Sequence, residues 1–169
     1  MFLWYYLVRV ACHTLERKWE KLVMKTPNFS IKDLPTILPY EVLRIIGQLR
    51  VAGTTRKIRT TNDLLEATNN PKKRKEASAK TGIGEERLLE LANFCALMRI
   101  KHLGPVYVIL LRACGVHTVV ELKDRNSTRL YESMRGKNLE LRLAKTVPHE
   151  KTIDAWKIAA IEQGRSIFY

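Results

Sequence analysis

Apolar residues recur at helical spacing through most of the chain, which predicts a protein built from helices. One apolar face lies in the first half of the sequence: Val42, Leu43, Ile45, Ile46 and Leu49. A second lies near the middle: Leu88, Leu89, Leu91, Ala92 and Cys95. The run from Val106 to Leu111 is rich in β-branched residues, but the turn before it and Gly115 after it favour a short buried helix. A last helix is expected from Pro148, with Ile153, Trp156 and Ala160 on its buried side.

Two short glycine-containing turns separate these expected helices. Gly82-Ile83-Gly84 precedes one helix start, and Lys101-His102-Leu103-Gly104 precedes another. Glycine tolerates positive φ and lets another backbone come close. A helix that follows such a turn presents unpaired backbone N–H groups, which suit a phosphate. This is the pattern of a helix-hairpin-helix, a module that often binds nucleic-acid backbones without reading their sequence.

Helix-start signals and an internal repeat indicate how the helices are organised. Thr118 and Glu121 form a capping-box pattern, and Ser30 with Asp33 forms a weaker one. Segment 49–53 resembles 111–115, and segment 60–64 resembles 118–122, so in both copies a capped helix follows a helix that ends at glycine. Chance similarity of such short motifs is the alternative.

The repeat predicts an all-α fold of tandem helix-hairpin-helix units, a SAM-like helical bundle preceded by an N-terminal amphipathic helix. The expected divisions are the N-terminal helix at 1–26, a degraded first unit at 27–70, and a second unit at 71–169 that ends in the C-terminal helix.

Both ends of the chain are apolar and are candidates for docking onto a partner. The aromatic residues there are Phe2, Trp4, Tyr5, Tyr6, Phe168 and Tyr169. The N-terminal run is too short for a bilayer span, which needs about 20 apolar residues, and it lacks the basic leader and cleavage site of a secretory signal. We expect no transmembrane span, and contact with a membrane surface is the alternative to protein docking.

The net charge indicates which classes of partner the protein can bind, and the cysteines indicate the cellular compartment. The chain carries 30 Lys and Arg against 17 Asp and Glu, a formal net charge of +13. Anionic polymers or an acidic membrane surface are the natural partners, and a generally basic proteome is the alternative. Cys12, Cys95 and Cys114 are read as reduced core residues. The expected location is the cytoplasm, or the interior of an organelle of bacterial descent.

The basic residues concentrate around the two glycine turns. Lys80, Lys101 and Arg112 lie close to them in sequence, and no carboxylate occurs from Leu91 to Val120. The densest run, Lys72-Lys73-Arg74-Lys75, follows Asn69-Asn70-Pro71 in what we expect to be a linker. That run is open to three interpretations: a phosphate contact, a nuclear localisation signal, or a solvated loop.

The order of these motifs resembles an uncharacterised bacterial domain family, frequent in cyanobacteria, of tandem helix-hairpin-helix proteins. The resemblance extends from Leu88 to Ala160, with a weaker match from Leu34 to Leu65. Its matching features are Thr81-Gly82-Ile83-Gly84, Leu91-Ala92-Asn93, Leu97 to Gly104, Gly115 to Leu122, Arg125-Asn126, Pro148 and Trp156. The family pattern has glycine where His102 stands, so the second turn departs from it. The resemblance implies a fold, because the family has no settled activity.

Catalytic chemistry has little support in the sequence. There is no nucleophile–base pairing, Walker-type loop or acidic metal cluster. A zinc site from Cys95, His102, Cys114 and His117 is conceivable, but core cysteines are favoured. We therefore expect no enzyme, no metal, no cofactor and no small-molecule ligand.

The leading hypothesis is a non-enzymatic, sequence-tolerant module that binds the phosphates of DNA or RNA. Amides of Gly82, Gly84 and Gly104, in the turns that contain Ile83 and His102, would bind phosphate oxygens. Lys80, Lys101 and Arg112 would supply countercharge, with peripheral contacts from Lys72, Lys73, Arg74 and Lys75. The alternative is a structural or adaptor subunit of a larger assembly, in which the turns only pack helices and the apolar ends dock onto protein subunits.

Overall fold

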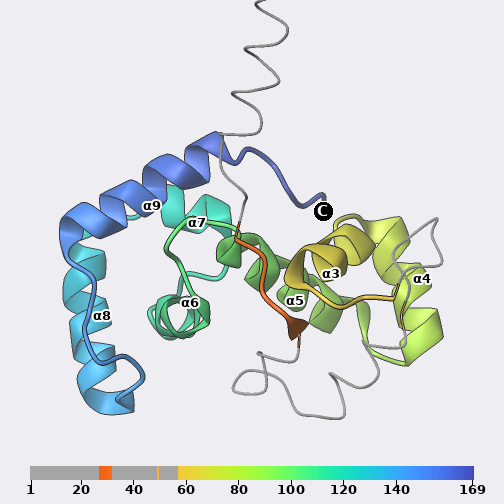
Figure 1. Ribbon diagram of the computed structural model, residues 1–169, viewed down its shortest axis with the longest axis horizontal. Helices are drawn as coiled ribbons and strands as arrows, with labels where there is room; N and C mark the ends of the chain where they lie inside the picture. Colours follow the sequence, from red (N-terminus) through yellow and green to blue (C-terminus); the bar gives the residue numbers. More distant parts are fainter. Residues whose placement is uncertain (1–26, 32–48, 50–56) are drawn as a thin grey trace, which may run out of the picture.

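A computed structural model describes residues 27–31, 49 and 57–169 (Figure 1). Within these residues the chain forms helices and no strand, which confirms the all-α prediction there. The helices are α3 (Thr61–Thr68), α4 (Pro71–Thr81), α5 (Glu85–Met98), α6 (Pro105–Ala113), α7 (Val119–Asp124), α8 (Ser127–Leu141) and α9 (Glu150–Glu162). None of the described helices is long and apolar enough to cross a bilayer.

Helix α5 lies at the centre of the fold (Figure 1). It packs against α3 and α4 on one side and against α6 and α7 on the other. From Leu91 to Met98 every residue of α5 is buried, so this part of the helix faces protein all round. A helix with that composition is stable only inside a core, and the rest of the domain assembles around it.

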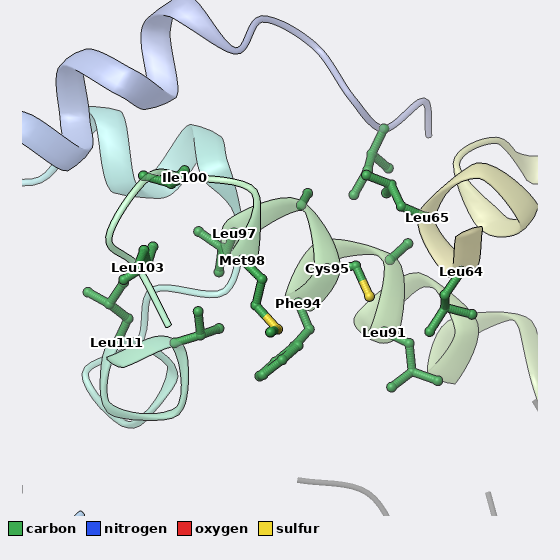
Figure 2. Close-up of a cluster of buried hydrophobic side chains, with 14 of the residues drawn as sticks. Leu64, Leu65, Leu91, Phe94, Cys95, Leu97, Met98, Ile100, Leu103 and Leu111 are labelled. Atoms are coloured by element: carbon green, nitrogen blue, oxygen red, sulfur yellow. The ribbon is translucent and has the colours of Figure 1, made fainter. Parts of the chain in front are cut away.

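The core joins α3, α5 and α6 (Figure 2). Its buried members include Leu64, Leu65, Leu91, Phe94, Cys95, Leu97, Met98, Ile100, Leu103 and Leu111. Ile100 and Leu103 come from the turn between α5 and α6, so the core fixes this turn from inside. Each fully buried leucine or isoleucine contributes about 1.5–3 kcal/mol relative to an exposed one.

The C-terminal segment returns from α9 to α3 and links the two sides of the domain (Figure 1). Gln163 Nε2 donates to the carbonyl of Ala96 at 3.0 Å, and the side chain of Ile167 is buried. The amide of Phe168 donates to the carbonyl of Asn69 at 2.8 Å. The end of the chain is therefore part of the packed structure.

The prediction of a linker at Asn69–Lys75 is wrong, because α4 begins within this segment. Pro71 occupies the first turn of α4, and Asn70 Oδ1 accepts the amide of Lys73 at 2.9 Å. Asparagine before proline is a helix-start signal. The basic residues that follow obscured this signal, because a run of basic residues is also typical of a solvent-exposed loop.

The other helix-start predictions differ in detail. Thr118 Oγ1 accepts the amide of Glu121, but Glu121 Oε2 accepts from His117 instead of closing the box on Thr118. A complete capping box is found at Thr60 and Asp63. The last helix begins at Glu150, so Pro148 lies just before it.

Some of the sequence predictions concern residues outside the described part. These are the amphipathic helix at 1–26, with Phe2, Trp4, Tyr5 and Tyr6, the helix through Val42, and residues 50–53 of the first repeat copy. The described piece near them is a short antiparallel pairing: the amide of Ile31 donates to the carbonyl of Arg59, and that of Thr61 to Phe29, both at 2.9 Å.

Candidate functional site

The first glycine turn joins α4 to α5 and is open to solvent. Gly82 ends α4 in the left-handed conformation (φ 72°), whereas Gly84 begins α5 with φ −57°, which any residue adopts. Neither glycine has an atom within 4 Å of where a Cβ would stand. The amide of Gly82 donates to Ser78 O at 2.8 Å, so it is not available to a phosphate as the sequence hypothesis required. Ile83 is half-buried, and its amide donates to Thr81 Oγ1 at 3.3 Å.

The start of α5 carries two opposing features. No side chain caps it, so the first amides of the helix lack an intrahelical or side-chain acceptor. Glu85 and Glu86 occupy its first turn and are exposed. They stabilise the positive end of the helix dipole, but they also repel an incoming anion.

The second turn joins α5 to α6 and has the more favourable charge. His102 adopts the left-handed conformation (φ 64°) in place of a glycine. Gly104 begins α6 with no side-chain cap and no acidic residue in the first turn. Lys101 and His102 are exposed beside this start. Pro105, the first residue of α6, has no N–H, so the donors at this start are the amides of Gly104, Val106 and Tyr107. They lie beside cationic side chains, and neither the turn nor the first turn of α6 contains a carboxylate, which suits a phosphate.

The side chain of the neighbouring Arg99 contacts the C-terminal segment and is partly buried. Its Nη1 donates to Ser166 Oγ at 3.2 Å, and partial burial lowers the pKa of Arg99. Arg99 therefore belongs to the packing of the domain.

The two turns lie at opposite ends of α5. The helix has 14 residues, and a rise of 1.5 Å per residue separates its ends by about 21 Å. One phosphate cannot contact both turns. A polyanion that uses both must extend along α5.

The predicted basic contacts differ in their accessibility. Lys72, Lys75 and Lys80 are exposed on α4, whereas Lys73 Nζ donates to the carbonyl of Glu66 at 2.8 Å. Arg112 is half-buried in the last turn of α6, at the far end of that helix from Gly104.

The sequence places Arg74 among the predicted peripheral phosphate contacts, but the structure buries this side chain. It is only 5% exposed, with Nη1 donating to Thr68 O at 3.1 Å and Nη2 to Phe168 O at 3.0 Å. Position 74 belongs to the same basic run as its neighbours, but the helix turns it inward. Its guanidinium holds the C-terminal segment on α4.

The predicted docking residues at the C-terminus have exposed rings on an anchored backbone. Phe168 and Tyr169 are 49% and 65% exposed. The Phe168 backbone binds Asn69 and Arg74, and the Tyr169 hydroxyl donates to Asn93 Oδ1 at 3.3 Å. Docking through this end would use these rings while the backbone stays in place.

A groove beside the second turn was not predicted from the sequence. It runs along α9, has a volume of about 480 Å³, and is lined in part by Lys101, His102, Lys151, Trp156, Ile158 and Glu162. Lys151, Ile158 and Glu162 are spaced along one side of α9, a stripe that the helical pattern contains. Its closeness to Lys101 depends on tertiary packing.

The cysteines and histidines of the described residues form no cluster able to hold a metal ion. Cys95 is buried, which raises the pKa of its thiol to about 12, and Cys114 is half-buried. The conceivable zinc set is therefore not assembled in this part of the chain.

Comparison with known proteins gives the family. The family model described as a domain of unknown function, DUF4332, matches residues 48–163. The chain belongs to the DUF4332 family. The match covers α3 to α9 and therefore includes both glycine turns and the α9 groove. The comparisons with curated proteins and with solved structures gave no match.

Proposed function

We propose that this DUF4332 protein is a non-enzymatic module that binds the phosphate backbone of nucleic acid with little sequence preference. The supporting observation is the second turn, where the uncapped start of α6 lies beside exposed Lys101 and His102 with no first-turn acid. Backbone amides at a helix start and nearby cations are a combination that favours phosphate. The net charge of +13 adds long-range attraction to a polyanion.

Under this proposal α4–α5 and α5–α6 are two helix-hairpin-helix units that share α5. The second turn is the primary contact, and the first turn, with Lys80 and the exposed lysines of α4, is the peripheral one. Glu85 and Glu86 make the first turn weaker, while Gly84 leaves it open to a close backbone approach.

The experiment is a salt titration of binding to a fluorescent oligonucleotide, measured by anisotropy with the full chain. The test variant is Lys80→Glu plus Lys101→Glu. The matched control is Arg135→Glu plus Lys145→Glu, which reverses two exposed charges on α8 and in the loop after it. Both variants change the net charge by the same amount, so long-range attraction is reduced equally.

We expect the test variant to bind at least about tenfold more weakly than the control, and to show a shallower salt dependence. On duplex DNA the log–log slope changes by about 0.9 for each phosphate that the protein no longer neutralises. Equal binding by the two variants, at every salt concentration, contradicts the proposed binding of phosphate at the turns.

A structural or adaptor role is the second candidate. Its supporting observation is a set of large apolar side chains on the surface of α8 and α9: Leu139, Leu141, Ile158 and Ile161. Absence of oligonucleotide binding by the wild-type protein at low salt would favour this candidate.

A further inference from the structure

The α9 groove has an apolar wall that no described residue covers. Ala155, Ile158 and Ala159 line it, and Ile158 is 58% exposed. The volume of about 480 Å³ falls within the roughly 300–1,000 Å³ typical of ligand sites. The groove therefore has room for a flat apolar group of the size of a nucleobase.

The charged residues that line this groove are mainly cationic. Lys101 and His102 come from the second turn and Lys151 from the first turn of α9. No ion pair involves Lys101 or Lys151 within residues 57–169. Glu162 lies eleven residues beyond Lys151, which is about 16 Å along the helix. Two lysines and a histidine line the groove against one carboxylate, so its lining favours an anion.

Trp156 contributes a buried indole to the wall of the groove. Its side chain lines the groove and is 1% exposed, and among the described residues its Nε1–H has no hydrogen-bond partner. A buried donor without an acceptor costs about 1–3 kcal/mol.

We propose that the α9 groove binds one unstacked base of a single-stranded nucleic acid, while the lysines in its lining, Lys101 and Lys151, attract the phosphates that flank this base. This inference rests on the proposed function and specifies its substrate. Bases of a duplex are paired and stacked and cannot enter a groove, whereas a single strand offers a base and a phosphate together. The protein then prefers single strands to duplexes.

The test compares three probes of equal length: a single-stranded 20-mer, its duplex, and a single strand with abasic sites throughout. The variant is Ile158→Ser, which removes an apolar wall of the groove without changing charge. The matched control is Ile161→Ser, on the same helix and 63% exposed, which does not line the groove. Circular dichroism melting confirms that both variants fold.

We expect wild type and Ile161→Ser to bind the single strand about tenfold more tightly than the duplex or the abasic strand. In Ile158→Ser this preference should fall to about threefold or less. Equal affinity of wild type for all three probes overturns the base-binding groove, yet leaves the phosphate proposal standing. No binding of any probe overturns both.

An acidic peptide with one aromatic residue serves as the competing occupant. If it binds wild type but not Ile158→Ser, and does not compete with the single strand, the groove belongs to a protein partner and the base-binding proposal is wrong. Displacement of the single strand by the free nucleotide, but not by this peptide, supports the proposal.

Discussion

Arg74 makes a direct test of how the fold is held together. Its guanidinium joins the end of α3, through Thr68 O, to the C-terminal segment, through Phe168 O. Replacement by methionine keeps a long apolar side chain in the same space but removes both donors. The carbonyl of Thr68, whose residue is buried, then loses its charged partner.

The size of the effect follows from the two bonds. A hydrogen bond from a charged donor contributes about 1.5–3 kcal/mol, and part of this is offset because the buried guanidinium no longer has to be desolvated. We expect Arg74→Met to lower the free energy of unfolding by about 2–4 kcal/mol. Arg74→Lys should lose about half as much, since one ammonium cannot span both carbonyls in the fork geometry of arginine.

The assay is urea unfolding at equilibrium, with Lys75→Met as the matched control. Lys75 is the next residue on α4, is exposed, and loses the same charge. Control and wild type should agree within about 0.5 kcal/mol. If Arg74→Met is as stable as Lys75→Met, the guanidinium does not hold the C-terminal segment. Arg74→Met should bind oligonucleotide at least as tightly as Lys75→Met, because Arg74 does not reach the surface whereas Lys75 is one of the exposed lysines of the peripheral contact.

Further predictions concern the turns and the cysteines. Gly82→Ala should lower the free energy of unfolding by about 1–2 kcal/mol, because φ is 72° there. Gly84→Ala should change the free energy of unfolding by no more than about 0.5 kcal/mol. Urea unfolding of both variants checks this, and equal losses would contradict it. His102→Gly should raise stability by about 0.5–1 kcal/mol by relieving its positive φ, seen as a higher urea midpoint, and an unchanged or lower midpoint counts against strain at this turn. Burial raises the pKa of Cys95 to about 12 from 9.0, so at pH 8 a thiol reagent should modify Cys114 before Cys95, with peptide mapping as the readout. Equal labelling of the two cysteines in the native protein would contradict the burial of Cys95. Because the unfolded chain loses this thiol proton at a lower pH than the folded chain does, the contribution of Cys95 to stability is complete below about pH 9. It is lost as pH rises toward about 12.

Local sequence signals identified most of the described helices. The apolar spacing around Leu91 and the glycine turns on either side of α5 predicted where that helix begins and ends. The β-branched run from Val106 was correctly assigned to a helix, because the flanking turns outweigh the strand propensity of valine and isoleucine. The sequence misjudged Asn69–Lys75, where a dense positive charge concealed a helix start.

Two parts of the candidate site were beyond any pattern along the chain. The direction of Arg74 depends on which face of α4 meets the C-terminal segment, and that segment lies 94 residues away in sequence. The α9 groove depends on the packing of the second turn beside α9, which brings Lys101 and His102 into one lining with residues of that helix.

The order of residues was enough to establish the helical class, the two glycine turns and the cationic character of this DUF4332 chain. These follow from local backbone preferences and from composition, which act within a few residues or need no structure at all. Packing between distant segments settled which cations remain available to a ligand. Arg74 is turned inward by its bonds to Thr68 and Phe168, while Lys101 and the start of α6 stay open. The amide of Gly82 is instead used locally, by the end of α4. Burial and hydrogen bonding remove a polar group from the surface whatever its neighbours in sequence are, because the energetic cost of desolvating that group depends on its surroundings in space.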